Sequence, residues 1–279
     1  MQRVIDSVRE AEQFIRTKAG ITADTEPEFG IILGTGLGGL VGEIEIEAEI
    51  PYEIIPHFPV STVESHKGRL LLGRLSGRRV VAMQGRFHYY EGYSARDVVF
   101  PVRVMKFLGI RRLFVSNAAG SLSETIGKGD LMVLRDHINL LPESPFRGAH
   151  EPEFGPRFPD PLGTYDLTMV ARALEIAGEK GIRCFAGVYV SVAGPQLETA
   201  SEYQYLHRIG GDAVGMSTVP EALAAKQMNI PVFAISVITD NGYPPSVVEA
   251  TSLEDVIRVA SQAEPRMTAI LCALVAEAE

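Results

Sequence analysis

The sequence predicts an α/β fold in which a mixed, largely parallel and twisted β-sheet is flanked by helices. Short apolar runs rich in β-branched residues recur along the chain and have the length of buried strands. Segments with apolar residues at helical spacing separate several of these runs, and that alternation is typical of a sheet covered by helices. A chain of 279 residues, 46% of them hydrophobic, can fill one large core, so we expect a single domain over residues 1–279.

The chain begins with the pattern of an amphipathic helix. Val4, Ile5, Val8, Phe14 and Ile15 recur among charged residues, whereas a signal peptide carries an uninterrupted apolar stretch. The sequence contains no run of about 18 apolar residues that would span a membrane. We therefore expect a cytoplasmic protein without a membrane partner.

Short apolar runs predict the strands, and a longer helix is predicted to end the chain. The runs cover residues 29–33, 70–75, 79–83, 113–116, 131–134, 185–190 and 232–238. Alternating acidic and apolar side chains over residues 43–50 predict a further strand. From Leu253 to Leu274, apolar residues recur at helical spacing behind a capping box formed by Thr251 and Glu254. Ligands of such folds gather at the carboxyl ends of the strands.

Residues 142–163 are expected to form a long irregular loop, because they hold six prolines, three glycines and few aliphatic residues. A segment of this length is too long for a plain connection. It is predicted to act as a lid or as an interface.

Composition excludes several kinds of partner. The formal net charge is -9 and the basic residues are scattered, so neither nucleic acid nor an anionic membrane surface is expected to bind. The two cysteines, Cys184 and Cys272, are far apart and lie outside any metal-binding spacing. We therefore expect no disulfide framework, no metal site and a reducing compartment.

The glycine-rich segment 34–39 directly follows the first predicted strand. Glycines let the backbone approach an anion closely and present its N–H groups, so this segment is predicted to cradle phosphate. The same residues satisfy the G-x-G-x-x-G pattern of dinucleotide-binding proteins, but that motif requires a helix to follow, and a strand is expected here. A simple tight turn is the third interpretation.

Polar residues gather near other strand ends. Arg86 and His88 follow the run 79–83, and His66 precedes the run 70–75. A guanidinium matches the geometry of an oxyanion, and an imidazole can donate to one. Each residue alone is more typical of a surface ion pair or a satisfied core residue. Their coincidence at one strand end favours anion binding.

Further segments place small or polar residues at strand ends. Residues 116–121 would let a flat ligand lie against the backbone, and Glu198 stands in a Gly-Pro turn. Residues 215–217 follow another short apolar run, and residues 238–241 end the last strand with hydrogen-bonding side chains. Taken alone, each is an ordinary junction, and a glutamate in a turn is usually solvated.

Together these segments resemble one family, the trimeric type of purine nucleoside phosphorylase within the nucleoside phosphorylase superfamily. The similarity covers nearly the whole chain, and the conjunction of motifs is far more specific than any one of them. In family order they are LGTGLGGL, SHKGRLLLG, QGRFHYYEGY, SNAAG, LRDHINL, GVYVSVAGPQLET, DAVGMSTVPE and ISVITD.

The resemblance implies a role for each matching residue. Phosphate would be bound by Thr35, His66, Arg86, Ser217 and the backbone of Ala118. Ribose would be held by His88, Tyr90 and Met216, with Leu253 at the 5′ position. The base would contact Leu197, Glu198, Val214, Gly120, Thr239 and Asp240, and also Phe158 of a neighbouring subunit. The catalytic residues would be His88, Glu198 and Asp240.

The resemblance also implies the reaction. Phosphate would displace a purine from C1′ of a (2′-deoxy)ribonucleoside, giving the free base and (deoxy)ribose 1-phosphate. The ribosyl group becomes oxocarbenium-like as the base leaves, and a bound phosphate dianion stabilises it and then attacks. Phosphate is then a co-substrate, no metal or organic cofactor is needed, and the expected assembly is a homotrimer.

Asp240 departs from the family pattern, because forms specific for 6-oxopurines have asparagine there. An ionised carboxylate only accepts hydrogen bonds. Protonation would make it a donor to N7, or it would accept from the 6-amino group of adenine, or a one-residue shift would bring Asn241 into place. Glu198 suits the N1–H edge that hypoxanthine and guanine have and adenine lacks. Inosine and guanosine are therefore the predicted substrates.

Leu253 is the second departure, because the family often has a histidine against the 5′-hydroxyl. An apolar side chain would suit a 5′-methylthio group, as in the related methylthioadenosine phosphorylases; we favour the simpler interpretation that Leu253 belongs to the core face of its helix. A methylthioadenosine or methylthioinosine phosphorylase and a broad-specificity enzyme that accepts adenosine stay open. So do two other classes, a nucleotide-cofactor oxidoreductase with NAD(P) at 34–39 and a noncatalytic nucleoside-binding protein.

Overall fold

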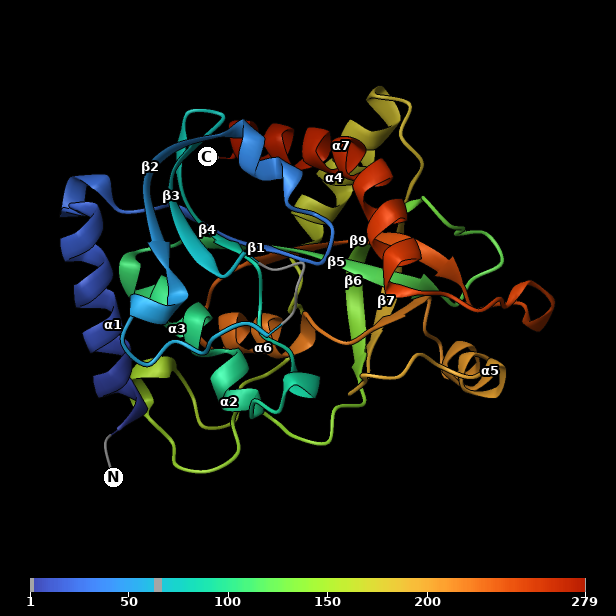
Figure 1. Ribbon diagram of the computed structural model, residues 1–279, viewed down its shortest axis with the longest axis horizontal. Helices are drawn as coiled ribbons and strands as arrows, with labels where there is room; N and C mark the ends of the chain where they lie inside the picture. Colours follow the sequence, from blue (N-terminus) through green and yellow to red (C-terminus); the bar gives the residue numbers. More distant parts are fainter. Residues whose placement is uncertain (1–2, 63–66, 279) are drawn as a thin grey trace.

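The computed structural model describes residues 3–62 and 67–278, and within them it forms one mixed nine-stranded sheet (Figure 1). The centre of the sheet consists of β1 (Phe29–Leu33), β5 (Arg112–Ser121) and β9 (Val232–Asn241), which run parallel. β1 is buried along its whole length, as expected for a strand with parallel neighbours and helices on both faces. The predicted fold class is confirmed.

One flank of the sheet is an antiparallel meander. It consists of β2 (Ile44–Pro51), β3 (Arg69–Leu75) and β4 (Arg78–Gln84), and β4 joins β1 in parallel. The strand predicted from the alternating pattern over residues 43–50 is therefore present as β2.

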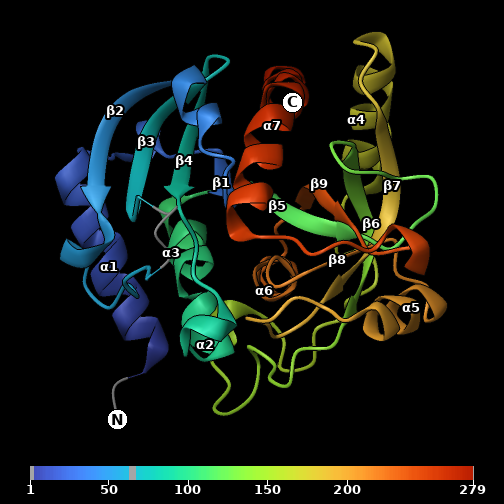
Figure 2. The same ribbon diagram turned by 45° about the vertical axis from the view of Figure 1, so that its right-hand side comes forward.

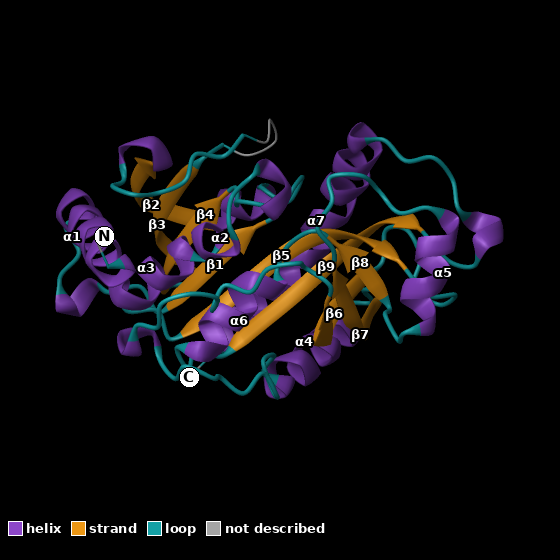
Figure 3. Ribbon diagram, turned by 90° about the horizontal axis from the view of Figure 1, so that it is seen from below, coloured by secondary structure: helices purple, strands orange, loops and turns teal. Residues whose placement is uncertain are grey.

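The other flank closes on itself. β6 (Leu131–Asn139) pairs with β7 (Cys184–Ser191) and with β9, while β8 (Ala213–Gly215) pairs with β7 and with β5. Because β5 also pairs with β9, the strands β5, β9, β6, β7 and β8 form a closed ring of hydrogen-bonded neighbours (Figure 3). We call this five-strand unit the ring.

Helices cover the sheet on both faces (Figures 1 and 2). One apolar cluster joins the sheet to α1 (Val4–Ala19), α2 (Ala95–Val98), α3 (Phe100–Leu108) and α6 (Val219–Gln227). A second joins the opposite face to α4 (Leu167–Glu179) and α7 (Leu253–Glu277), and α5 (Ala200–Arg208) lies at the far end beside the ring. In the described ranges no helix has the length and apolar character needed to cross a membrane.

Every predicted strand is present, but three run further than expected. β5, β6 and β9 continue to Ser121, Asn139 and Asn241 through small and polar residues. Neighbouring strands of the ring give these residues backbone hydrogen bonds, although their small and polar side chains are not of the kinds favoured in strands.

The predicted cap of the last helix is wrong by one residue. Ser252 is the N-cap of α7, where its hydroxyl accepts from the N–H of Asp255 at 3.1 Å. The Asp255 carboxylate accepts in turn from the N–H of Ser252. Thr251 and Glu254 have the same spacing, so the motif alone does not decide between the two pairs.

The proline-rich segment is irregular, as predicted, with one short 3-10 turn over Pro152–Phe154. Its Glu151 is buried and reaches the start of α1, where its two carboxylate oxygens accept from the N–H groups of Val4 at 2.8 Å and Ile5 at 2.6 Å. The N-cap residue of α1 makes no side-chain capping bond. Glu151 therefore caps this helix although it is far away in the sequence, and it attaches the middle of the loop to α1.

Candidate active site

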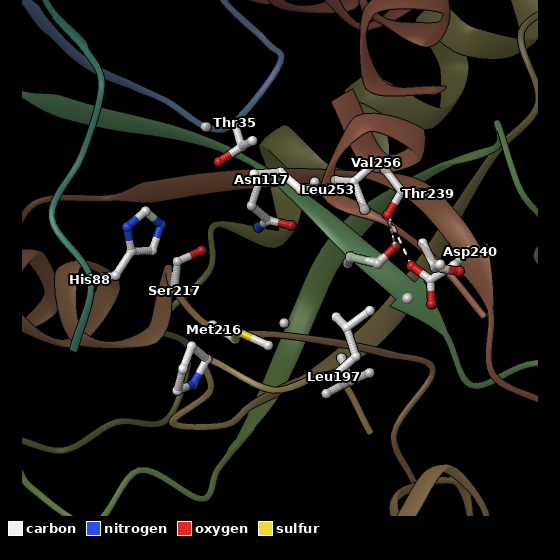
Figure 4. A pocket seen from close by; sticks show the side chains of 18 of the residues that line it. Thr35, His88, Asn117, Leu197, Met216, Ser217, Thr239, Asp240, Leu253 and Val256 are labelled. Carbon is white, nitrogen blue, oxygen red and sulfur yellow. Dashed lines mark hydrogen bonds between the residues drawn. The ribbon is translucent and has the colours of Figure 1, made fainter. Parts of the chain in front are cut away.

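A cavity of about 600 Å³ opens where the carboxyl ends of β1, β4, β5, β8 and β9 meet the first turn of α7 (Figure 4). This location agrees with the expected binding edge of an α/β sheet. Most of the predicted site residues line it, namely Thr35, Arg86, His88, Tyr90, Ala118, Gly120, Leu197, Glu198, Val214, Met216, Ser217, Thr239, Asp240 and Leu253.

Two predicted residues are not in this group. His66 lies outside the described residues. Phe158 is 88% exposed and lines a separate hollow of about 400 Å³ between the proline-rich loop and α6. Within one chain the structure therefore does not bring Phe158 to the cavity.

The backbone of the glycine-rich loop lies very close to the backbone of β5. A β-carbon on Gly34 would lie 2.8 Å from the carbonyl oxygen of Ser116, and Gly36 has a φ of +72° that favours glycine. The loop is followed by a 3-10 turn over Gly39–Glu43 and then by β2. The helix required by a dinucleotide-binding motif is absent at this place, which contradicts the NAD(P) hypothesis.

Arg86 is held rigidly beneath the cavity. It is 1% exposed, and its Nε and Nη2 both donate to one carboxylate oxygen of Glu221, at 3.0 and 2.5 Å. Its Nη1 donates to the carbonyl of Ser116 at 2.9 Å. A buried guanidinium needs such a partner, because an isolated buried charge is costly. Glu221 stands in the VPE segment at the start of α6 and was not among the predicted site residues.

His88 is oriented by a second carboxylate. Glu91 accepts from the His88 N–H at 2.8 Å, contacts its Nδ1 at 3.0 Å, and accepts from the Thr62 N–H and hydroxyl. Burial alone would raise the pKa of Glu91, but the hydrogen bonds from His88 and Thr62 outweigh burial and lower it to about 2. Because an ionised carboxylate only accepts, Nδ1 of His88 carries the hydrogen.

Burial favours the neutral form of the His88 imidazole. Burial, with a smaller contribution from the charge of Arg86, lowers its pKa despite the opposing effect of Glu91. The ring also stacks on Tyr90, with centroids 4.6 Å apart. With hydrogen on Nδ1, Nε2 is an acceptor, so this side chain is suited to accept from a hydroxyl of a sugar or of a protonated phosphate.

A pair of carboxylates lines another part of the cavity. Asp240 is 8% exposed and accepts from the Tyr203 hydroxyl at 3.1 Å and from the Thr239 hydroxyl at 3.0 Å. Burial, joined by the negative charge of Asp240, raises the pKa of Glu198 to about 7. Tyr203 was missed because it stands in the middle of α5, without any motif around it.

The proposed one-residue shift toward Asn241 is wrong. The side-chain oxygen of Asn241 accepts from the backbone N–H of Lys128 at 3.0 Å, and Asn241 is not among the cavity-lining residues. Of these two residues, Asp240 is the one that lines the cavity.

The expectation that Leu253 belongs to the core face of its helix is also wrong. It is the first residue of α7, is 57% exposed, and lines the cavity with Thr251 and Val256. The helical pattern of apolar residues starts at Leu253, whereas the buried face of α7 begins only at Val259.

No group of three His, Cys, Asp or Glu side chains with metal-binding geometry occurs in residues 3–62 and 67–278. Cys184 and Cys272 are both free thiols. The described residues that line the cavity offer a buried guanidinium, an imidazole, hydroxyls and two carboxylates.

Known proteins are similar to this chain in sequence and in fold. Residues 28–276 match the family model of the phosphorylase superfamily. The chain is 44% identical to purine nucleoside phosphorylase 1 of Bacillus subtilis, over 98% of this chain and 99% of that relative. It is 48% identical to purine nucleoside phosphorylase 1 of Geobacillus stearothermophilus, over 84% of each.

Solved structures agree with these similarities. The purine nucleoside phosphorylase of Schistosoma mansoni in complex with adenosine has a TM-score of 0.90 at 38% identity, covering 99% of this chain and 98% of that one. A Schistosoma purine nucleoside phosphorylase in complex with hypoxanthine has a TM-score of 0.91 at 37% identity, covering 100% of both chains.

Proposed function

Because the chain belongs to the phosphorylase superfamily, and within it to the purine nucleoside phosphorylases, we propose that its substrates are inosine, guanosine and their 2′-deoxy forms. The enzyme is a pentosyltransferase, in which phosphate displaces the purine from C1′ of the nucleoside. The observation that carries the choice of base is Glu198, a carboxylate in the cavity that suits the N1–H of a 6-oxopurine.

Phosphate binds where the glycine-rich loop, Arg86 and Ser217 meet. Arg86 supplies the fixed positive charge, and Thr35, Ser217, His66 and the backbone of Ala118 supply the surrounding hydrogen bonds. Thr35 and Ser217 lie in the same part of the cavity as His88 (Figure 4), which supports this grouping. The buried ion pair keeps the guanidinium in place before phosphate arrives, so little reorganisation is needed.

The sugar lies between phosphate and base, against Tyr90 and Met216. His88 accepts from a sugar or phosphate hydroxyl through Nε2. As the glycosidic bond breaks, positive charge develops at the ribosyl ring, and the neighbouring phosphate dianion stabilises it before attacking C1′. This mechanism uses inorganic phosphate as a co-substrate and needs neither a metal nor an organic cofactor.

The base packs between Leu197 and Val214 and contacts the backbone near Gly120. Its polar edge meets Glu198, Thr239 and Asp240. Of these, Thr239 and Asp240 lie away from Thr35 and Ser217 in the cavity (Figure 4). Glu198 accepts from N1–H, and Asp240 serves O6 or N7 when it carries a hydrogen.

We further propose that the enzyme acts as a homotrimer in the cytoplasm. Phe158 and Leu162 are 88% and 79% exposed in one chain, and large apolar side chains that are this exposed on one loop are typical of an interface. In the trimer, Phe158 completes the base site of a neighbouring subunit.

A 5′-methylthio nucleoside is the second candidate substrate. The observation that favours it is Leu253, whose exposed apolar side chain faces the cavity beside Val256. A 5′-methylthio group would gain apolar burial there, whereas a 5′-hydroxyl would gain no hydrogen bond from leucine.

The test is release of free base from inosine, guanosine, adenosine and 5′-methylthioadenosine, each with and without phosphate. We expect phosphate-dependent release of hypoxanthine and guanine, and a loss of at least about 100-fold in Arg86→Ala. Full activity of that variant would contradict the site assignment, and absence of phosphate-dependent release from inosine and guanosine would contradict the proposed substrates.

A further inference from the structure

A second, much smaller cavity lies where the proline-rich loop meets α2 and α3. Its volume is about 20 Å³, which leaves room for about one or two species of the size of water. Three basic side chains line it, namely Arg96 from α2, Arg103 from α3 and Arg157 from the loop itself. In the described chain this cavity shares no lining residue with the active-site cavity, so it is a separate candidate site.

The three arginines hold one stretch of the loop backbone. Arg96 and Arg103 donate through Nη2 to carbonyl oxygens within residues 145–149, at 3.0 and 3.3 Å. Arg157 donates through Nη1 to another carbonyl oxygen of the same stretch at 2.7 Å. The path of the loop therefore brings three guanidinium groups together around a short piece of backbone.

Arg103 is buried with most of its hydrogen-bonding capacity unused. It is 3% exposed, and its Nε and Nη1 have no hydrogen-bond partner; the Nε of Arg96 is buried without a partner as well. The Arg103 guanidinium lies on the Phe154 ring, 4.6 Å from the ring centroid. Stacking covers the face of a guanidinium, whereas its N–H groups point outward in the plane and still need acceptors. Buried N–H groups are almost always paired in native proteins.

Positive charge around the cavity exceeds negative charge. Glu151 is the one carboxylate among the described lining residues, and its two oxygens accept from the start of α1 rather than from Arg103. Burial, followed by the positive charge of Arg96, lowers the pKa of Arg103 to about 10 despite the opposing effect of Glu151. The His150 side chain, which also lines the cavity, supplies no negative charge. Water would satisfy the free N–H groups, but only an anion would also balance the buried charge.

We propose that this cavity binds a small inorganic anion of halide size, chloride in ordinary buffers, and that the anion joins α2 and α3 to the proline-rich loop. A halide accepts N–H groups from several directions and carries a single negative charge. A tetrahedral oxyanion such as phosphate is larger than the cavity, so this is no second phosphate site. The proposal goes beyond the enzymatic function and does not depend on which nucleoside is the substrate.

The bound anion gives the loop a second anchor. Glu151 already attaches the loop to α1, and an anion held by Arg96 and Arg103 would attach it to two more helices. Arg157 precedes the exposed Phe158, so the same contact lies next to the proposed interface residue. An anion that binds only the folded chain stabilises it in proportion to the logarithm of its concentration.

The first test is crystallographic. Crystals grown with bromide in place of chloride, measured at the bromine absorption edge, should show an anomalous peak in this cavity within hydrogen-bonding distance of Arg103. The peak should be absent in Arg103→Met, which keeps a long side chain without charge. Arg147→Met is the matched control and should keep the peak, because Arg147 is exposed on the same loop and does not line this cavity.

The second test is made in solution. Thermal unfolding is followed while chloride replaces gluconate at constant ionic strength, so that screening is unchanged and only the size of the anion differs. The Tm of the native chain should rise by about 2–4 °C and then level off as the site fills. Arg147→Met should respond in the same way, whereas the Tm of Arg103→Met should not depend on chloride.

Arg96→Met keeps the test decisive if Arg103→Met does not fold. It leaves the buried Arg103 in place and removes one charged donor from the cavity. The chloride concentration that gives half of the Tm increase should therefore rise about tenfold, since hydrogen bonds to charged groups contribute about 1.4 kcal/mol or more. An unchanged concentration would contradict a site shared by the two arginines.

Three outcomes would overturn the anion site. The cavity holds ordered water alone, or it is filled by a carboxylate of another copy of the chain. Alternatively, a bromide peak occurs while the native Tm does not depend on chloride, which would mean an adventitious ion only. All three leave the proposed phosphorolysis intact, because neither measurement uses turnover.

Discussion

The orientation of Arg86 depends on a buried side chain that never reaches the cavity. Glu221 is not a cavity-lining residue, but one of its oxygens accepts two hydrogen bonds from the guanidinium. In Glu221→Gln we expect the KM for phosphate to rise about tenfold and the KM for inosine to change less than about twofold, because one charge-assisted pair is weakened.

Steady-state kinetics with each substrate varied separately measures this difference. Glu221→Ala should in addition lower the free energy of unfolding by about 3–5 kcal/mol, since it leaves a buried cation without its partner. Glu175→Gln, in an exposed ion pair with Arg172, is the control and should change neither quantity. A rise in both KM values of Glu221→Gln would contradict a role limited to positioning Arg86.

In the proposed binding mode, Leu253 is the side chain that the 5′ end of the sugar meets. Leu253→His introduces a donor and acceptor and removes apolar surface, so the kcat/KM ratio of 5′-methylthioinosine to inosine should fall about tenfold. Competition between the two nucleosides in one reaction measures the ratio directly. An unchanged ratio would show that the methylthio group does not contact this residue.

Glu91 makes the stability of the segment around His88 dependent on pH. Its pKa in the folded protein is about 2, below the ordinary value of 4.5. A carboxyl group with a depressed pKa stabilises the folded state fully above pH 4.5, and this contribution is lost as pH falls toward 2. Glu91→Gln should therefore be less stable than the native chain in urea at pH 7, and the difference should shrink steadily between pH 4.5 and the lowest pH at which the native chain still folds.

The sequence motifs identified most of the cavity-lining residues, because Thr35, Arg86 and Asp240 each stand at or near the end of a strand. Glu221 and Tyr203 act on Arg86 and Asp240 through space. Glu221 and Tyr203 are 135 and 37 residues from the side chains they contact. Sequence spacing cannot reveal such contacts, since they exist only after the strands and helices have packed together.

At the scale of elements, α1 depends on a cap from the proline-rich loop. Glu151→Ala removes the acceptor for the N–H groups of Val4 and Ile5. Loss of a helix cap typically lowers stability by about 1 kcal/mol, and buried unsatisfied donors add to this. Chemical denaturation should show a decrease of about 1–3 kcal/mol, whereas Glu153→Ala, which removes only an exposed partner of Arg3, should change stability by less than about 0.5 kcal/mol.

A helix or strand is easier to predict from the sequence when it contains more apolar residues in a regular pattern. β1 is a five-residue apolar run with buried neighbours, and its predicted bounds match the structure. β8 has only Ala213, Val214 and Gly215, and it exists because β5 and β7 lie on either side of it. The cap of α7 was misplaced because two overlapping pairs satisfy the same motif, and only the path of the chain selects Ser252.

At the scale of the assembly, the proposed trimer can be tested through its shared sites. Light scattering should give a mass of about 91 kDa, which corresponds to three copies of the 30.3 kDa chain. Phe158→Ala should lower kcat/KM for inosine by about tenfold while leaving this mass unchanged, because one apolar wall of each base site is lost.

Co-expression of Phe158→Ala with Arg86→Ala provides the decisive comparison. Mixed trimers would contain some sites in which Arg86 comes from one chain and Phe158 from its neighbour, so activity should exceed that of either variant alone. Activity no higher than the average of the two variants would mean that Phe158 serves its own chain or no site at all.

The ring has a consequence for how the protein is made. β9 is the last strand in the chain, and it supplies the hydrogen bonds that β5 and β6 lack until it arrives. While the ribosome is still adding residues 122–231, the nascent chain therefore carries an open strand edge along β5, and such edges recruit other chains. Ribosome-bound fragments that stop before Val232 should bind chaperones that recognise exposed strands. Release should follow only once the segment through Asn241 has left the exit tunnel, so the binding cavity forms late in synthesis.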